Sequence, residues 1–96
     1  MDAQKRNVSD FLPLIRSHIS GETKNDPNIG DMIKAIREFV GLTQRELADE
    51  MQLSRKTISK YENDFLSFKR VVSLHKFAKA LSVNNYIVKP DDFLIV

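Results

Sequence analysis

Residues 43–62 carry the side chains whose types and spacing could do chemistry. Ser54 can cap a helix that begins directly after it. Four polar or basic side chains follow at helical spacing: Arg55, Lys56, Ser59 and Lys60. The DNA major groove admits one helix, and only the first turns of that helix reach the base edges. The stretch therefore predicts a helix that reads DNA bases.

Charge is unevenly distributed along this stretch. Residues 54–60 contain three cations and no anion, whereas residues 46–50 contain three anions and no cation. Such a division is typical of one face turned to an anion and another turned to solvent. Charge alone leaves an alternative open, in which both are ordinary solvated helix faces.

Two short helices joined by a tight turn are expected to position these side chains. Thr43 is expected to cap the first helix, and Glu46 completes a capping box in which two backbone donors are satisfied. Gln52 and Leu53 form the turn, and the second helix is expected to end at Asn63. The side chains expected to face inward are Leu47, Ala48, Met51, Ile58 and Tyr61.

Further helices are expected on both sides of this pair. Apolar spacing predicts a helix over residues 29–40, with Asp31 in its first turn and Gly41 at its end. The same spacing predicts a helix over residues 71–81, with Lys76 and Lys79 on its outer face. Residues 64–69 are expected to form an unusually apolar loop.

The sequence pattern at the two ends of the chain predicts a helix in the N-terminal segment and two alternatives for the tail. In the N-terminal segment, Ser9 or Asp10 is expected to cap one helix that contains Pro13 in its first turn. The apolar stripe expected on this helix consists of Phe11, Leu12 or Leu14, Ile15, His18 and Ile19. Residues 20–28 are expected to form a loop or linker. After residue 86, Pro90 opens a short helix, which is the favoured interpretation, or belongs to a turn between two β-rich runs.

Composition narrows the classes of function. Ninety-six residues fit one small domain, and the net charge of +2 is too small to indicate a nucleic-acid-binding protein by itself. The absence of cysteine excludes disulfides and thiolate metal sites. No apolar run has the length of a signal peptide or membrane span, so a cytoplasmic location is expected.

Catalytic and metal chemistry find little support in the sequence. His18 and His75 show no spacing typical of metal ligands, so packing is the expected role of each. We find no Ser/His/Asp constellation and no phosphate-binding glycine loop. No enzyme activity, cofactor or metal is therefore expected.

Residues 36–63, followed by Phe77-Ala-Lys-Ala-Leu81, resemble the phage repressor/Cro family of helix-turn-helix proteins, the xenobiotic response element-like group. The motifs that carry the resemblance are Gly-Leu-Thr-Gln (41–44), Glu-Leu-Ala (46–48), Ser-Arg-Lys-Thr-Ile-Ser (54–59) and Tyr-Glu-Asn (61–63). The resemblance covers about residues 29 to 83. It implies an all-α fold, a five-helix repressor-like domain with an extra N-terminal helix and a C-terminal tail that is a short helix or β. The division expected is an N-terminal extension (1–28), a DNA-binding domain (29–86) and a tail (87–96).

The resemblance also implies roles for particular residues. Arg55, Lys56, Ser59 and Lys60 would read bases, and arginine or lysine pairs well with the two acceptors of guanine. The residues that would contact phosphates are Arg37, Gln44, Ser54, Asn63, Lys69 and Arg70. In the family the arginine matching Arg37 bridges the helix ends by pairing with the residue that matches Glu62. The alternative for this pair is an ordinary surface ion pair worth less than about 1 kcal/mol.

One position departs from the family pattern within the motif. The usual glycine of the turn between the helices is Gln52 in this sequence. If its φ is positive, a non-glycine residue is strained there.

Two functions from different classes are compatible with the sequence. The first is a transcriptional regulator, expected to be a repressor, that binds double-stranded DNA as a homodimer on a palindromic operator in the cytoplasm, associated with the nucleoid. The second is an antitoxin-type protein-interaction module that also binds its own operator and docks a protein partner through the N-terminal segment. The apolar tail Phe93-Leu-Ile-Val96 suits a partner surface, or it packs onto the same domain.

Overall fold

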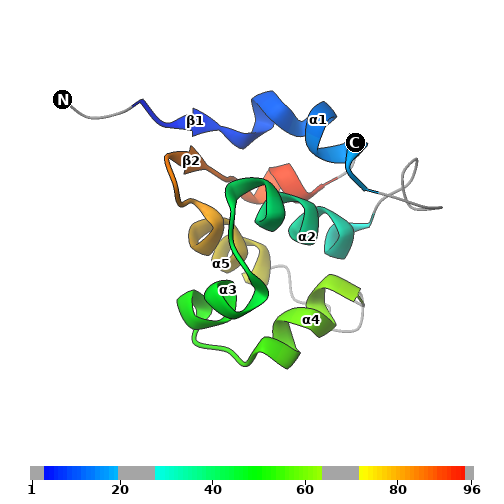
Figure 1. Ribbon diagram of the computed structural model, residues 1–96, viewed down its shortest axis with the longest axis vertical. Coiled ribbons are helices and arrows are strands. Elements are labelled where there is room, and N and C mark those ends of the chain that lie inside the picture. Colours follow the sequence, from blue (N-terminus) through cyan, green and yellow to red (C-terminus); the bar gives the residue numbers. More distant parts are fainter. Residues whose placement is uncertain (1–3, 20–27, 64–71, 95–96) are drawn as a thin grey trace.

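The computed structural model describes residues 4–19, 28–63 and 72–94, with the backbone alone at 72 and 73. Over these ranges the chain forms five α-helices, two 3-10 helices and two very short strands (Figure 1). In chain order they are β1 (Arg6–Asn7), η1 (Val8–Phe11), α1 (Leu12–Ser17), α2 (Ile29–Val40), α3 (Gln44–Met51), α4 (Arg55–Asn63), α5 (Val72–Leu81), β2 (Tyr86–Ile87) and η4 (Pro90–Phe93). The expected all-α class is confirmed.

Helix α2 has sequence signals at both ends, and the structure uses them. The Asn28 side chain accepts from the Asp31 amide at 2.8 Å, and the Asp31 carboxylate accepts from the Asn28 amide at 3.0 Å. This capping box gives Asp31 a more specific role than the dipole interaction expected for it. At the other end Gly41 has φ of 89°, so the helix ends in the left-handed conformation that glycine adopts without strain.

The helix pair α3 and α4 also begins as expected. Thr43 and Glu46 form the capping box of α3, with contacts of 3.1 Å and 2.9 Å. The Ser54 hydroxyl accepts from the Thr57 amide at 3.1 Å and so caps α4. Between the two helices, Gln52 has φ of 57° and ψ of 42°, which confirms the suspected left-handed conformation.

We expect the substitution Gln52→Gly to raise the free energy of unfolding by about 0.5–1 kcal/mol. Glycine removes left-handed strain of about 1–2 kcal/mol, and part of this gain is lost because glycine makes the unfolded chain more flexible. Urea denaturation of the two proteins measures the difference. Gln52 is exposed, so its side chain contributes little burial to compensate. If the Gln52→Gly protein were less stable than the wild type, the inference that Gln52 is strained would be wrong.

The core lies where α2, α3, α4 and α5 meet, and elements from both ends of the chain close it. The largest fully buried side chains are Val8, Ile15, Met32, Ile33, Ile36, Leu47, Ile58, Phe77, Leu81 and Phe93. Tyr61 packs edge-on against Phe77, with ring centroids 5.1 Å apart. The inward positions expected for Leu47, Ala48, Ile58 and Tyr61 are confirmed, and Met51 is partly buried beside them.

The N-terminal segment differs in detail from the expected single helix. It opens with the strand β1 and the 3-10 helix η1, and α1 begins only at Leu12, with Pro13 in its first turn. Ile15 and Ile19 are buried as expected. Leu14 is 52% exposed and His18 is exposed, so the expectation that His18 packs inward is wrong. The six-residue α1 is too short to turn more than a narrow face toward α2.

Two segments near the ends of the described chain pair with each other. Strand β1 pairs in parallel with β2, with Arg6 opposite Tyr86 and Asn7 opposite Ile87. Three aromatic rings from separate segments, Phe11, Phe39 and Tyr86, lie with centroids 5.1–6.2 Å apart. The favoured interpretation of the tail is confirmed, because the short 3-10 helix η4 begins at Pro90; the two-residue strand β2 precedes it.

Several expectations concern residues outside the described ranges. They are the linker residues 20–27, the apolar loop at 64–69, the phosphate contacts Lys69 and Arg70, the helical start at residue 71, and the last two residues of the tail. Helix α5 is described from Val72 and ends at Leu81, as expected, before two left-handed residues, Asn84 and Asn85.

Candidate nucleic-acid interface

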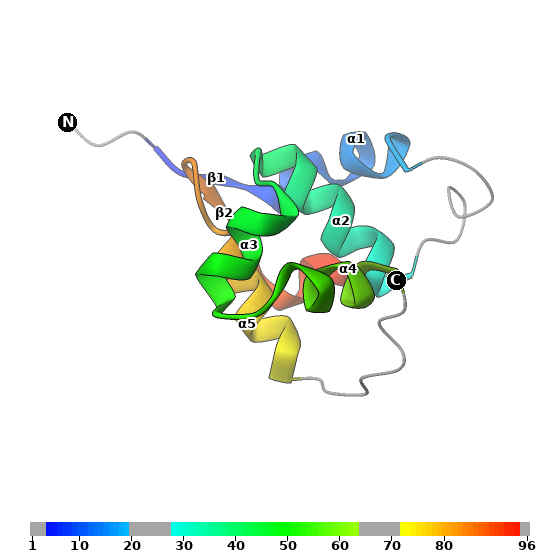
Figure 2. The same cartoon turned by 60° about the horizontal axis from the view of Figure 1, so that its bottom comes forward.

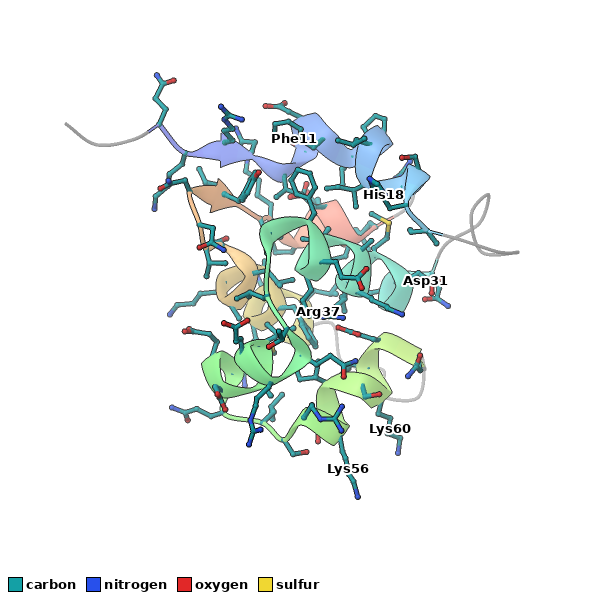
Figure 3. All side chains as sticks on the ribbon, in the orientation of Figure 1. Phe11, His18, Asp31, Arg37, Lys56 and Lys60 are labelled. Carbon is teal, nitrogen blue, oxygen red and sulfur yellow. The ribbon has the colours of Figure 1, made fainter. Side chains whose placement is uncertain are left out.

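Helix α4 combines a buried face with an exposed basic face. Ile58, Tyr61 and Glu62 are buried and hold the helix against the core. The side chains of Arg55, Lys56 and Lys60 are exposed, and Ser59 is partly exposed between them. Figure 3 shows Lys56 and Lys60 pointing away from the body of the molecule. In Figure 2 the view turns α4 toward the reader, with no other described helix in front of it.

The structure brings the first residues of α3 and α4 together. Arg55 donates from Nη1 to Oε1 of Gln44 at 3.3 Å. Gln44 donates in turn from Nε2 to Oε1 of Glu62 at 3.0 Å. The amide of Gln44 therefore connects an exposed guanidinium to a carboxylate in the interior. The hydrogen bond to Gln44 gives the exposed guanidinium of Arg55 a preferred direction.

Arg37 and Glu62 form a buried ion pair. Arg37 Nε lies 2.6 Å from Glu62 Oε2, and the two side chains are 8% and 1% exposed. A second contact runs from Nη2 to Oε1 at 3.3 Å, and Nη1 donates to the Leu42 carbonyl at 2.8 Å. The alternative of an ordinary surface pair is therefore wrong. Figure 3 shows Arg37 in the middle of the molecule, between α2 and the α3–α4 pair.

Burial changes the energetic weight of this pair. A surface pair contributes less than about 1 kcal/mol, whereas breaking a buried pair by deleting one partner costs about 3–5 kcal/mol. Each nitrogen of the Arg37 guanidinium holds a protein acceptor, so the arginine joins α2 to the start of α3 and the end of α4. This arrangement favours a role in positioning over direct contact with phosphate.

Ser54 and Asn63 lie at opposite ends of α4. Both are exposed. The Ser54 hydroxyl caps the helix and lies 2.9 Å from the Thr57 hydroxyl. Asn63 donates from Nδ2 to the Ser59 hydroxyl at 3.3 Å. Because α4 rises about 1.5 Å per residue, these two residues are about 13 Å apart along it and flank the basic face.

Sequence reasoning overlooked two residues that fix α2, the helix against which α4 packs. Gly30, in the first turn of α2, lies against the backbone of α4 at Tyr61 and Glu62. Asn84 donates from Nδ2 to the Val40 carbonyl at 2.6 Å and so satisfies the end of α2. The sequence did contain a signal for Gly30. Glycine weakens a helix, so a glycine inside the predicted helix 29–40, away from any turn, indicates close packing.

The described residues contain neither a metal-binding cluster nor a membrane-spanning helix. Within residues 4–19, 28–63 and 72–94, no three His, Asp or Glu side chains gather closely enough to hold a metal ion. None of the helices described there is long and apolar enough to cross a membrane.

Comparison with known proteins agrees with this geometry. The family described as "Helix-turn-helix domain" matches residues 30–86, which is more than half of the chain. The match spans α2 to α5 and reaches the start of β2. No curated protein and no solved structure matches the chain. Residues 30–86 contain both helices of the pair and the buried ion pair that links α2 to α4, and the chain belongs to the helix-turn-helix domain family.

Proposed function

We propose that this protein is a sequence-specific DNA-binding transcriptional regulator that acts as a repressor by inserting α4 into the major groove. The observation that carries the proposal is the exposed basic face of α4, formed by Arg55 and Lys56 at its start and Lys60 in its last turn. Membership in the helix-turn-helix domain family indicates a DNA-binding regulator in general terms. An α-helix with a basic start fits the width of the major groove.

The proposed contacts divide by chemistry. Arg55, Lys56, Ser59 and Lys60 would reach base edges, and a guanine is the best partner for an arginine that presents two donors. Gln44, Ser54 and Asn63 would donate to phosphates, with Lys69 and Arg70 as further candidates. We assign Arg37 to the placement of α3 and α4, because its guanidinium is largely enclosed by protein acceptors.

A homodimer on a palindromic operator is part of the proposal. One recognition helix reads few base pairs, and a two-fold dimer gains affinity from two half-sites about one helical turn apart. Among the described residues of the tail, Leu94 is 40% exposed and is the large apolar residue available for such a surface. Phe93 is fully buried, so for this residue the alternative of packing onto the same domain is correct.

The second function, an antitoxin-type module with a docked partner, receives less support. Val8, Ile15 and Ile19 of the N-terminal segment are buried in the protein's own core. Those apolar side chains are therefore not available to a partner. Leu14 is the large apolar residue that stays exposed in the described part of this segment. We retain the regulator as the proposal, acting in the cytoplasm on the nucleoid.

Selection of binding sites from random DNA tests the proposal. We expect enrichment of a palindrome whose half-site centres are about 10 base pairs, or a multiple of that, apart. The affinity for the selected site should fall steeply as salt rises, because bound phosphates release counterions. Sedimentation of the complex should give two protein chains per site. If no sequence is enriched above random DNA, the proposal of sequence-specific binding is wrong.

A further inference from the structure

Gly30 lies in the first turn of α2, where that helix approaches the last turn of α4 most closely. A Cβ atom built on Gly30 would lie 2.8 Å from the Tyr61 carbonyl oxygen and 2.9 Å from the Glu62 carbonyl carbon, and closer still to the Glu62 carbonyl oxygen. All three atoms belong to the backbone, so no side chain can rotate to make room. Any larger residue at this position must push the two helices apart or tilt them.

Glycine at this position has a local cost that packing must offset. After proline, glycine is the least favourable residue in a helix, and alanine is the best. Gly30 is not in a left-handed conformation, so the backbone does not require a glycine there. The remaining physical reason for it is the space between α2 and α4. The same turn of α4 contains Glu62, which holds both Arg37 and Gln44.

We propose that Gly30 is a positioning residue that sets the tilt of α4 and thereby the base selectivity of the protein. Helix α4 is anchored near its middle by the fully buried Ile58. At about 1.5 Å per residue, Glu62 lies about 6 Å from Ile58 along the axis, so a displacement of about 1 Å there rotates α4 by about 10°. The start of α4, with Arg55, swings in the opposite direction.

The consequence for recognition differs between the two kinds of contact. Paired hydrogen bonds to a base edge tolerate errors of only about 0.5 Å and 10–20°. Contacts to phosphates position the protein on DNA but carry no sequence information directly. The tilt set by Gly30 therefore affects discrimination between sequences much more than affinity for DNA in general. This inference rests on the proposed function, because it concerns how the same helix selects its site.

The substitution Gly30→Ala tests the inference in the full-length protein. We expect α4 to rotate relative to α2 by about 10°, measured from backbone residual dipolar couplings. We expect the ratio of affinities for the selected operator and for random DNA to fall about tenfold or more, with the affinity for random DNA changed by no more than about twofold. Lys34→Ala is the matched control, since Lys34 is exposed on the same helix. Its charge loss affects both DNAs alike and leaves the ratio unchanged.

Three results would overturn the inference. The Gly30→Ala protein could keep the wild-type tilt, or tilt without losing discrimination, or fail to fold even at low temperature. Failure to fold would mean that the close approach of α2 and α4 at Gly30 is needed for folding and has no separate role in recognition. Failure of the proposed function is distinguishable from these, because the wild type itself would then show no preference for any sequence, while the dipolar couplings would still report the tilt.

Discussion

Replacing Glu62 with alanine is expected to lower the free energy of unfolding by about 3–5 kcal/mol. The substitution leaves the Arg37 guanidinium charged and buried without its carboxylate, and it removes the acceptor of the Gln44 amide. A domain of this size has a total stability of about 5–15 kcal/mol, so a large part of the protein's stability depends on this carboxylate. Urea denaturation at low temperature, where the variant is still largely folded, measures the loss.

Two further proteins make this result specific. Glu50→Ala removes an exposed carboxylate from α3 and is expected to change stability by no more than about 0.5 kcal/mol. The double substitution Arg37→Met, Glu62→Leu removes both charges and is expected to recover most of the loss, because apolar residues of similar size replace a buried pair well. A loss below about 1 kcal/mol in Glu62→Ala would mean that the pair behaves as an exposed one.

The Glu62→Ala variant also shows whether the ion pair affects DNA binding as well as stability. Glu62 orients Gln44, and Gln44 contacts Arg55, so weaker operator binding by the folded variant is expected. Unchanged operator affinity in the folded variant would confine the pair to a structural role.

Replacing Arg55 with alanine is expected to weaken operator binding by about 1–3 kcal/mol and to relax the preference at one base position. The reason is that the guanidinium presents two parallel donors at the start of α4, which in the proposed complex reaches the base edges. Fluorescence anisotropy on the selected operator and its single-base variants measures both effects. Arg55→Lys keeps the charge and loses the paired donors, so an intermediate loss of discrimination is expected.

Lys5→Ala is the matched control for the charge of Arg55. Lys5 is exposed directly before β1, which lies near the opposite end of the molecule from α4 (Figure 1). We expect its loss to leave the base preferences of the protein intact. If Lys5→Ala and Arg55→Ala weakened every DNA sequence equally, Arg55 would contribute only charge and the groove assignment would be wrong.

The parts of the fold that the sequence predicted well are those that local chemistry determines. Thr43 with Glu46, Ser54, and Gly41 each satisfy backbone groups within a few residues, so their effects can be read from adjacent positions. The positive φ of Gln52 was recognisable from the resemblance instead, because Gln52 stands where the family usually has a glycine.

The features that could not be predicted depend on residues far apart in the chain. The burial of Arg37 and Glu62 needs α2 and α4 in contact, and nothing in either local sequence distinguishes a buried pair from a surface one. Phe11, Phe39 and Tyr86 belong to three segments, and their meeting follows only from the tertiary structure. His18 was misplaced because helical spacing alone does not say how much of a short helix its neighbours cover.

The parallel pairing of β1 with β2 has a consequence for the order in which the chain folds. The contacts among α2, α3 and α4, such as that between Arg37 and Glu62, close much shorter loops, which is typical of faster folding. Arg6 and Tyr86, by contrast, lie near opposite ends of the described chain, so their pairing closes a loop that spans most of it. The pairing of only two residues in each strand stabilises the protein by little compared with the conformational entropy lost in closing this loop. The strand pair is therefore expected to form only after the helices have assembled, and to be the first part of the native protein to open.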